Sequence, residues 1–182
     1  MENEKPNLVQ HALKFGLIMG LFNIVLQLGI YIVKKELLVS FWVAFAAIVV
    51  TIVLAIYPIR NFRSQQGGSI TFKDAFLIGF IVFAGSGLLT NVFQYLLYNF
   101  IDPQLPDFIK EKAIEKTVGL MERFGAGQEE IAKAIEPLEK EDFKQTPSKL
   151  GTSFLGNVMM GAFLSLLIAL FTRKNPKNHN IE

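Results

Sequence analysis

The 182-residue sequence contains no cysteine and only two histidines, His11 and His179. Without cysteine the chain has no disulfide, no thiol nucleophile and no thiolate ligand for a metal. Two histidines near opposite ends of the chain do not have the spacing of a metal site, so we expect no metal and no other cofactor. Lysine and arginine (18) nearly balance aspartate and glutamate (16), which excludes the basic excess of a nucleic-acid-binding protein.

Charge is also absent from four long stretches of a chain that is rich in apolar residues. Hydrophobic residues make up 51% of the sequence, and the mean hydropathy is +0.37. At a rise of about 1.5 Å per residue, about 20 apolar residues cross a hydrocarbon core of about 30 Å. We therefore predict an all-α, polytopic membrane protein with four transmembrane helices. The predicted spans are approximately residues 13–33, 37–59, 75–100 and 150–171, within a single membrane domain over residues 1–182.

Local signals mark the ends of these spans. The third span follows the Gly67-Gly68 pair, and Thr71 stands three residues before Asp74, which is the spacing of a capping box. Pro58 is expected to end the second span, because proline lacks a backbone donor and clashes with the preceding turn. A polar loop then precedes the third span. Thr146-Pro147 has the pattern of an N-cap followed by proline in the first turn, and it is expected to open the fourth span.

Between the third and fourth spans, residues 102–149 are predicted to form an extramembrane helical insert. Residues 107–124 have the period of an amphipathic helix, with one charged residue, Lys110, on the apolar face. A weaker second helix is predicted over 128–139, with Pro137 expected to kink it. We expect the apolar face to lie on the bundle, on the membrane surface or on the second helix. The alternative is a docking face for another protein.

Basic residues near the ends of the spans predict the orientation of the chain. Eight of them fall on the side that holds both termini, whereas the insert carries 8 basic and 11 acidic residues, a net charge of −3. We predict that both termini are cytoplasmic and that residues 102–149 are periplasmic, although Lys34 and Lys35 in the first short loop favour the reverse. The eight basic residues are Lys5, Lys14, Arg60, Arg63, Lys73, Arg173, Lys174 and Lys177.

No ionisable residue lies deep in any predicted span, where proton relays and ion-coupled carriers usually place one. The spans contain side-chain amides instead, and the predicted depths bring three helices to one level. These amides are interpreted as hydrogen-bonding contacts between helices, worth about 0.6–2 kcal/mol each. The alternative is a small polar binding pocket. The residues of this predicted polar cluster are Asn23, Gln27, Asn91, Gln94 and Asn157.

Small residues recur every four positions in two spans. They begin at Ala12 in the first span and at Ser153 in the fourth. Such stripes allow the backbones of two helices to approach closely. We expect the partner helices to belong to the same chain, with a second copy as the alternative. The stripes consist of Ala12, Gly16 and Gly20, and of Ser153, Asn157, Gly161, Ser165 and Ala169.

The segment from Gly67 to Gly79, the sequence Tyr98-Asn-Phe-Ile-Asp-Pro103 and the closing Phe171-Thr-Arg-Lys174 together resemble a bacterial membrane family called domain of unknown function 4199. The resemblance extends over nearly the whole chain. It implies a small four-span protein of the bacterial inner (plasma) membrane. It implies no activity, cofactor or catalytic residue, so no functional site is taken from it.

Three functions remain open at this point. The first is a non-enzymatic component of the membrane, with an assembly, scaffold or regulatory role, surrounded by the lipid bilayer and associated with a membrane-protein partner or with further copies of itself. The second is a small transporter or channel that uses the amide cluster. The third is an enzyme acting on lipid, but the carboxylates of the insert have no histidine or serine companion, so we expect no enzyme.

Overall fold

The computed structural model describes residues 7–174, and Lys5, Lys177 and His179 lie outside that range. The chain is helical along most of this length. The elements are α1 (Leu8–Val33), the 3₁₀ helix η1 (Lys35–Val39), α2 (Phe41–Gln65), α3 (Phe72–Leu96), the π-helix η2 (Leu97–Ile101), α4 (Leu105–Arg123), α5 (Gln128–Lys140) and α6 (Pro147–Thr172).

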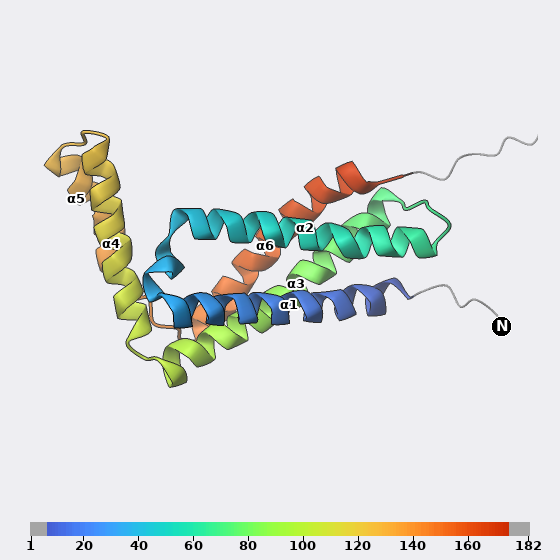
Figure 1. The fold of residues 1–182 in the computed structure, drawn as a ribbon, viewed down its shortest axis with the longest axis horizontal. Helices are drawn as coiled ribbons and strands as arrows, with labels where there is room; N and C mark the ends of the chain where they lie inside the picture. Colours follow the sequence, from blue (N-terminus) through green and yellow to red (C-terminus); the bar gives the residue numbers. More distant parts are fainter. Residues whose placement is uncertain (1–6, 175–182) are drawn as a thin grey trace, which may run out of the picture.

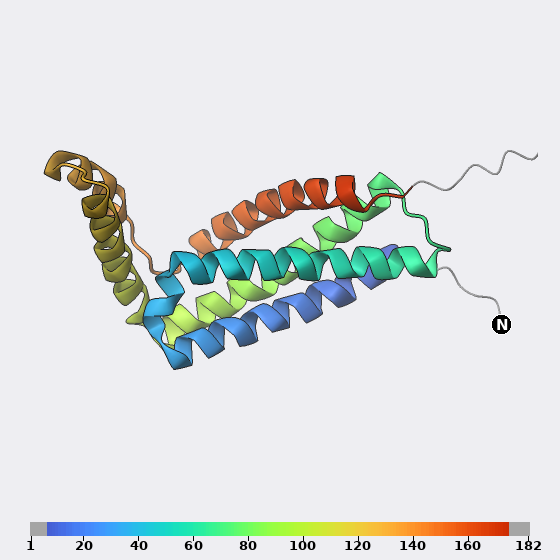
Figure 2. The same ribbon diagram turned by 45° about the horizontal axis from the view of Figure 1, so that its top comes forward.

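Helices α1, α2, α3 and α6 form an elongated bundle, and α4 and α5 form a separate helical pair at one end of it (Figure 1). All four bundle helices are long and apolar enough to cross a membrane. The prediction of an all-α membrane protein with four spans and a helical insert is therefore confirmed. We call α4 and α5 the arm, the bundle end beside it the arm end, and the opposite end, where residues 7 and 174 lie, the terminal end (Figure 2).

Helix α3 lies at the centre of the bundle because small residues allow α1 and α6 to approach it closely. A Cβ atom added at Gly16 would lie 3.2 Å from the carbonyl oxygen of Val82, and one added at Gly161 would lie 2.7 Å from Cβ of Phe83. Gly79 of α3 faces Ser165 of α6 in the same way. The two small-residue stripes therefore pack within the chain, which confirms that prediction.

Helix α2 joins this core chiefly at the terminal end. There Ala55, Ile59 and Phe62 are buried against residues of the other three helices. Two further contacts close this end: Ile70 and Lys174 pair by two backbone hydrogen bonds, and Arg63 donates a hydrogen bond to the Thr172 carbonyl. Towards the arm end, α2 has no comparable buried residues, and this difference leaves space between α2 and its neighbours.

The expected end of the second span at Pro58 is wrong. Helix α2 continues through Pro58 to Gln65, so the polar loop before α3 is shorter than predicted. Proline leaves one carbonyl of the preceding turn without its helical donor, and buried proline is tolerated in membrane helices when the surrounding helices support the backbone. Pro58 is fully buried here, and Nε2 of His11 lies 3.0 Å from its carbonyl oxygen.

Two further boundaries differ from the prediction. The second span does not begin at Leu37, because Lys35–Val39 form the 3₁₀ helix and α2 starts at Phe41. Helix α5 ends at Lys140, one residue beyond the predicted end at 139, and Pro137 lies inside it as expected.

The predicted helix caps are present. Oγ1 of Thr71 accepts a hydrogen bond from the Asp74 amide at 3.1 Å, and Oγ1 of Thr146 accepts one from the Lys149 amide at 3.2 Å. Glycine is required where α4 ends: Gly125 has φ of 76°, a left-handed conformation that other residues rarely adopt. The amides of Gly125 and Ala126 reach back to the carbonyls of Glu122 and Met121, which is the Schellman arrangement.

The close approach of α6 to α3 generates a prediction. Replacing Gly161→Ala forces a methyl group against Phe83, and we expect overpacking to cost about 1–3 kcal/mol. Gly156→Ala is the matched control, because a Cβ at Gly156 of the same helix meets nothing within 4 Å. Heating the purified variants in detergent and measuring the monodisperse fraction by size exclusion checks this. Equal thermal stability of the two variants would contradict the proposed contact.

Candidate functional site

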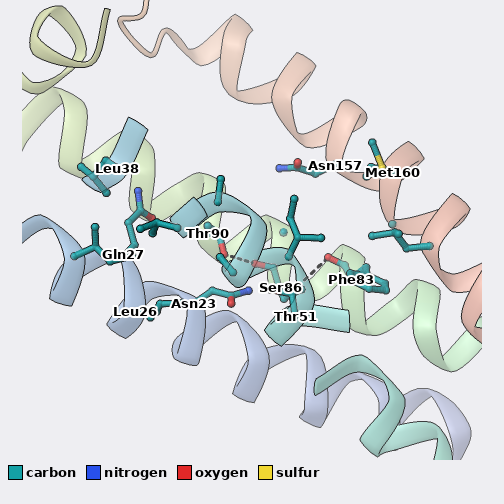
Figure 3. Close-up of a pocket in the computed structure, with 18 residues that line it drawn as sticks. Asn23, Leu26, Gln27, Leu38, Thr51, Phe83, Ser86, Thr90, Asn157 and Met160 are labelled. Carbon is teal, nitrogen blue, oxygen red and sulfur yellow. Dashed lines mark hydrogen bonds between the residues drawn. The ribbon is translucent and has the colours of Figure 1, made fainter. Parts of the chain in front are cut away.

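A cavity of about 460 Å³ lies between α1, α2, α3 and α6, in the half of the bundle nearer the arm. Its α2 wall consists of residues from the first half of that helix, between Val43 and Thr51, and Leu38 of η1 lies at its outer limit. The space exists because α2 is buried against the other helices at the terminal end and not here. Figure 3 shows side chains from all four spans around this cavity.

Six polar side chains line the cavity, and they come from every span. Two of them have partners within their own helix: Oγ of Ser86 donates to the Phe83 carbonyl at 3.2 Å, and Oγ1 of Thr90 donates to the Ser86 carbonyl at 2.9 Å. Asn23 and Gln27 on α1 and Asn157 on α6 extend from opposite sides of the cavity (Figure 3). The six residues are Asn23, Gln27, Thr51, Ser86, Thr90 and Asn157.

The three amides have no hydrogen-bond partner in the part of the chain that the structure describes. None of the hydrogen bonds made within residues 7–174 involves the side chain of Asn23, Gln27 or Asn157. Water satisfies such groups at an aqueous surface, but these lie in the membrane-spanning part of α1 and α6. An amide without a partner in an apolar environment costs about 1–3 kcal/mol, so these groups require a partner from outside the chain.

The other two amides of the predicted cluster do not line this cavity. Asn91 is buried, and its Nδ2 donates to the Gly87 carbonyl of its own helix at 2.7 Å. Nε2 of Gln94 donates to the Tyr98 hydroxyl at 3.0 Å, also on the same span. Depth along the helix alone predicted that both amides join the cluster. Their angular positions around the axis of α3 direct them away from the cavity lining.

Three lining residues were missed by the sequence analysis: Thr51, Ser86 and Thr90. Serine and threonine in a helix commonly bond to a carbonyl of the preceding turn, so they are weak indicators of a polar site. The four-residue spacing of Ser86 and Thr90 was the one available signal, because it places both hydroxyls on one face of the helix.

The rest of the lining is apolar, and no Asp, Glu, Lys, Arg or His lines the cavity. Within the described residues, no group of three or more His, Cys, Asp or Glu side chains is placed to hold a metal ion. A site of this kind has neither an acid–base pair nor a nucleophile with its base. Its chemistry is therefore hydrogen bonding by neutral groups within an apolar wall. The apolar lining includes Leu26, Ile30, Leu38, Val43, Ile48 and Phe83.

A second polar site fixes the base of the arm to the bundle. Oδ2 of Asp102, just before α4, accepts hydrogen bonds from Nζ of Lys35 at 2.5 Å and from the Tyr31 hydroxyl at 3.1 Å. The Lys35 ammonium holds the pKa of the Asp102 carboxyl below its ordinary range, and the carboxylate in turn raises the pKa of Lys35. Tyr31 lies in the last turn of α1, and Lys35 is the first residue of η1. This site therefore joins α1, η1 and the start of the arm.

Further contacts hold the arm along its length. Nζ of Lys116 on α4 donates to the Glu36 carbonyl of η1 at 3.1 Å. Lys110, the charged residue on the apolar face, donates to the carbonyls of Glu139 and Glu141 and so caps the end of α5. Nδ2 of Asn99 donates to the Gln145 carbonyl, which ties the returning chain to the end of the third span.

The short helix η1 takes part in both sites. Leu38 of η1 lines the cavity, while Lys35 and Glu36 of the same helix contact the arm. Five consecutive residues therefore both border the cavity and hold the arm.

The comparisons with known proteins identify a family. A family model described as "Protein of unknown function (DUF4199)" matches residues 14–174, and this confirms the resemblance inferred from the glycine loop and the span ends. No curated protein and no solved structure matches the chain.

The attachment of the arm generates a prediction about Asp102. Asp102→Asn removes the ion pair with Lys35, so we expect the arm to sample a wider range of orientations. Because the chain has no native cysteine, spin labels placed by Val49→Cys on α2 and Glu122→Cys on α4 report one distance. Double electron–electron resonance should show a broader distribution of this distance for Asp102→Asn than for the protein with Asp102. The matched control is Glu115→Gln, which removes a 2.5 Å ion pair with Lys112 inside α4 and should leave the distribution unchanged.

The same labelled protein gives the expected pH dependence. The pKa of Asp102 is depressed in the folded protein, so its contribution is present above the ordinary value of 3.8 and is lost as the pH falls through the depressed pKa. The pKa of Lys35 is raised, so its contribution is present below 10.5 and is lost only as the pH rises through the raised pKa. The distribution should therefore be constant from about pH 5 to pH 9. A broadening within this pH range would show that a titrating group other than Asp102 or Lys35 controls the attachment of the arm.

Proposed function

Because the chain belongs to the DUF4199 family, a family of proteins of unknown function, we propose its function from the arrangement of its own residues. It is a non-enzymatic component of a cell membrane that assembles with a neighbouring membrane protein and regulates it. The observation that carries this proposal is the arm, a helical pair with fixed attachments whose tip extends past the outline of the bundle (Figures 1 and 2).

The tip presents apolar side chains on the side that faces the bundle end. Leu120 and Phe124 are 56% and 83% exposed. At about 100° per residue they share one face of α4 with Ile109, which packs against buried residues of the bundle end. Leu120 and Phe124 are exposed because α4 continues beyond the bundle, so a protein standing beside the bundle in the membrane can contact them.

The other surfaces that favour helix association are already used within the chain. Gly16 and Gly20 of α1 and Gly161 of α6 pack on α3, and the apolar side of α5 packs on α4 through Ile131. The insert has a net charge of −3, which favours a partner with a basic outer surface. A regulatory role is supported by η1, which contacts both the cavity and the arm.

A small transporter or channel is the second candidate, and the polar cavity is the observation that favours it. The cavity lies in the arm-end half, whereas Ile59, Phe62 and Ile78 fill the interior at the terminal end. A path across the membrane would require these buried residues to separate, so transport ranks below assembly.

Assembly through the arm generates a prediction. A photo-crosslinking phenylalanine analogue at Phe124 should form a covalent adduct with one discrete membrane protein in native membranes. The same analogue at Glu111, on the opposite, solvent-facing side of α4, should not form it. The double substitution Leu120→Ser and Phe124→Ser should abolish co-purification of that protein while α4 stays folded. Adducts with lipid alone would show that the arm rests on the membrane surface and would reject the assembly.

The proposed location is the bacterial inner membrane, with both termini cytoplasmic and residues 102–149 periplasmic. The excess of basic residues at the terminal end and the net negative charge of the insert support this orientation.

The orientation predicts opposite thiol accessibility at the two ends. In cells stripped of the outer membrane, a cysteine replacing Gln128 at the arm tip should react with a membrane-impermeant thiol reagent. A cysteine replacing the exposed Ser64 at the terminal end should react only after lysis. The reverse pattern of labelling would show that the protein has the opposite orientation in the membrane, and it would leave the fold unchanged.

A further inference from the structure

The cavity opens sideways between α2 and α6. Ile48 on α2 and Met160 on α6 both line it and are 54% and 59% exposed, and Asn157 is also exposed. Helix α6 packs mainly on α3 and contacts α2 little, which leaves a gap between α2 and α6 among the described residues. In a membrane the opening faces lipid, which gives an apolar molecule a direct route into the cavity.

The lining restricts the chemistry of an occupant in two ways. The amides of Asn23, Gln27 and Asn157 offer both donors and acceptors but no charge. Among residues 7–174, no ionisable side chain lines the cavity. A charged group placed there would lose its hydration without gaining a counter-ion. Apart from the hydroxyls of Thr51, Ser86 and Thr90, the remaining wall is apolar, and water alone would solvate it poorly.

The volume also fits a small molecule. About 460 Å³ falls within the range of about 300–1,000 Å³ that is typical of ligand pockets. A transmembrane helix is about 10 Å across with its side chains, too wide to enter such a space. A small molecule is therefore an occupant of suitable size for this space.

We propose that this cavity binds an uncharged amphiphile from the surrounding membrane, a molecule with hydroxyl, ester or amide groups attached to an aliphatic or isoprenoid chain. Asn23, Gln27 and Asn157 hydrogen-bond its polar group. Its chain lies against Ile30, Val43 and Ile48 and leaves through the opening between α2 and α6. This inference does not depend on the proposed partner of the arm, because the cavity and the tip share no residue.

A neutral probe and a charged probe with the same chain test the proposal. The purified full-length protein in lipid nanodiscs is irradiated with a diazirine-bearing monoacylglycerol, or with the diazirine-bearing fatty acid at pH 9, where its carboxylate is ionised. The monoacylglycerol should label cavity residues, and unlabelled monoacylglycerol should compete for that labelling. The ionised fatty acid should label the cavity much less. Equal or stronger cavity labelling by the fatty acid overturns the uncharged class.

Variants then show which groups hold the probe. Gln27→Leu with Asn157→Leu should reduce competable labelling about tenfold or more, as expected for the loss of two hydrogen bonds in an apolar site. Gln94→Leu is the matched control. It removes a side-chain amide that lies in a span but bonds to Tyr98 and does not line the cavity. If the double variant does not fold, Thr51→Val, which removes only a hydroxyl on α2, should give a smaller reduction of the same sign.

Two results overturn the proposal outright. One is cavity labelling that is unchanged in the variants, or that does not compete. The other is the formation of crosslinks between two copies of the chain by cysteines at Asn157, which would show that protein covers the opening. The photo-crosslinking test of the arm is unaffected by either result, so failure of this inference and failure of the proposed assembly are distinguishable.

Discussion

The close approach of α1 and α6 to α3 is the constraint on which the rest of the structure depends. In a membrane there is little hydrophobic drive to bring helices together, so association relies on van der Waals contact between backbones that small residues allow. Gly16 on α1 lies against Val82 of α3, Gly161 on α6 lies against the next residue, Phe83, and Ser165 lies against Gly79. These contacts set the relative positions of α1, α3 and α6 without any contribution from α2.

The cavity follows from this arrangement. Helix α2 lacks a glycine stripe and is held through larger side chains at the terminal end, where Ile59 and Phe62 are buried. Towards the arm end it therefore stands away from α6, and the amides of the two facing helices are left without partners. A fold built for tight contact on three helices thus leaves one polar, uncharged space beside the fourth. This combination is suited to binding a neutral molecule and unsuited to acid–base chemistry.

The arm is positioned by polar contacts rather than by an apolar core. The ion pair between Lys35 and Asp102, the contact of Lys116 with the η1 backbone and the bond from Asn99 to the returning chain all lie at the arm end of the bundle. Each is modest at a partly hydrated surface. Together they restrain the arm, and two of them involve η1, which also borders the cavity.

The sequence by itself determined the four spans, the helical insert, the caps at Thr71 and Thr146 and the family. These features depend on local composition and on the spacing of residues along one helix. It also predicted that amides of three helices share one depth, but Asn157 lies level with Gly87, about one helical turn from Asn91.

Only the tertiary structure decided which polar groups meet, because that depends on the rotation of each helix about its own axis, and contacts between helices set the rotation. Asn157 packs against Gly87, one turn before Asn91, and Asn91 bonds within α3. Thr51 and Thr90 line the cavity instead. Pro58 stays within a helix because neighbouring helices support it, and Lys110 caps α5 because the two arm helices pair. Each outcome depends on a neighbour distant in sequence, which no local pattern specifies.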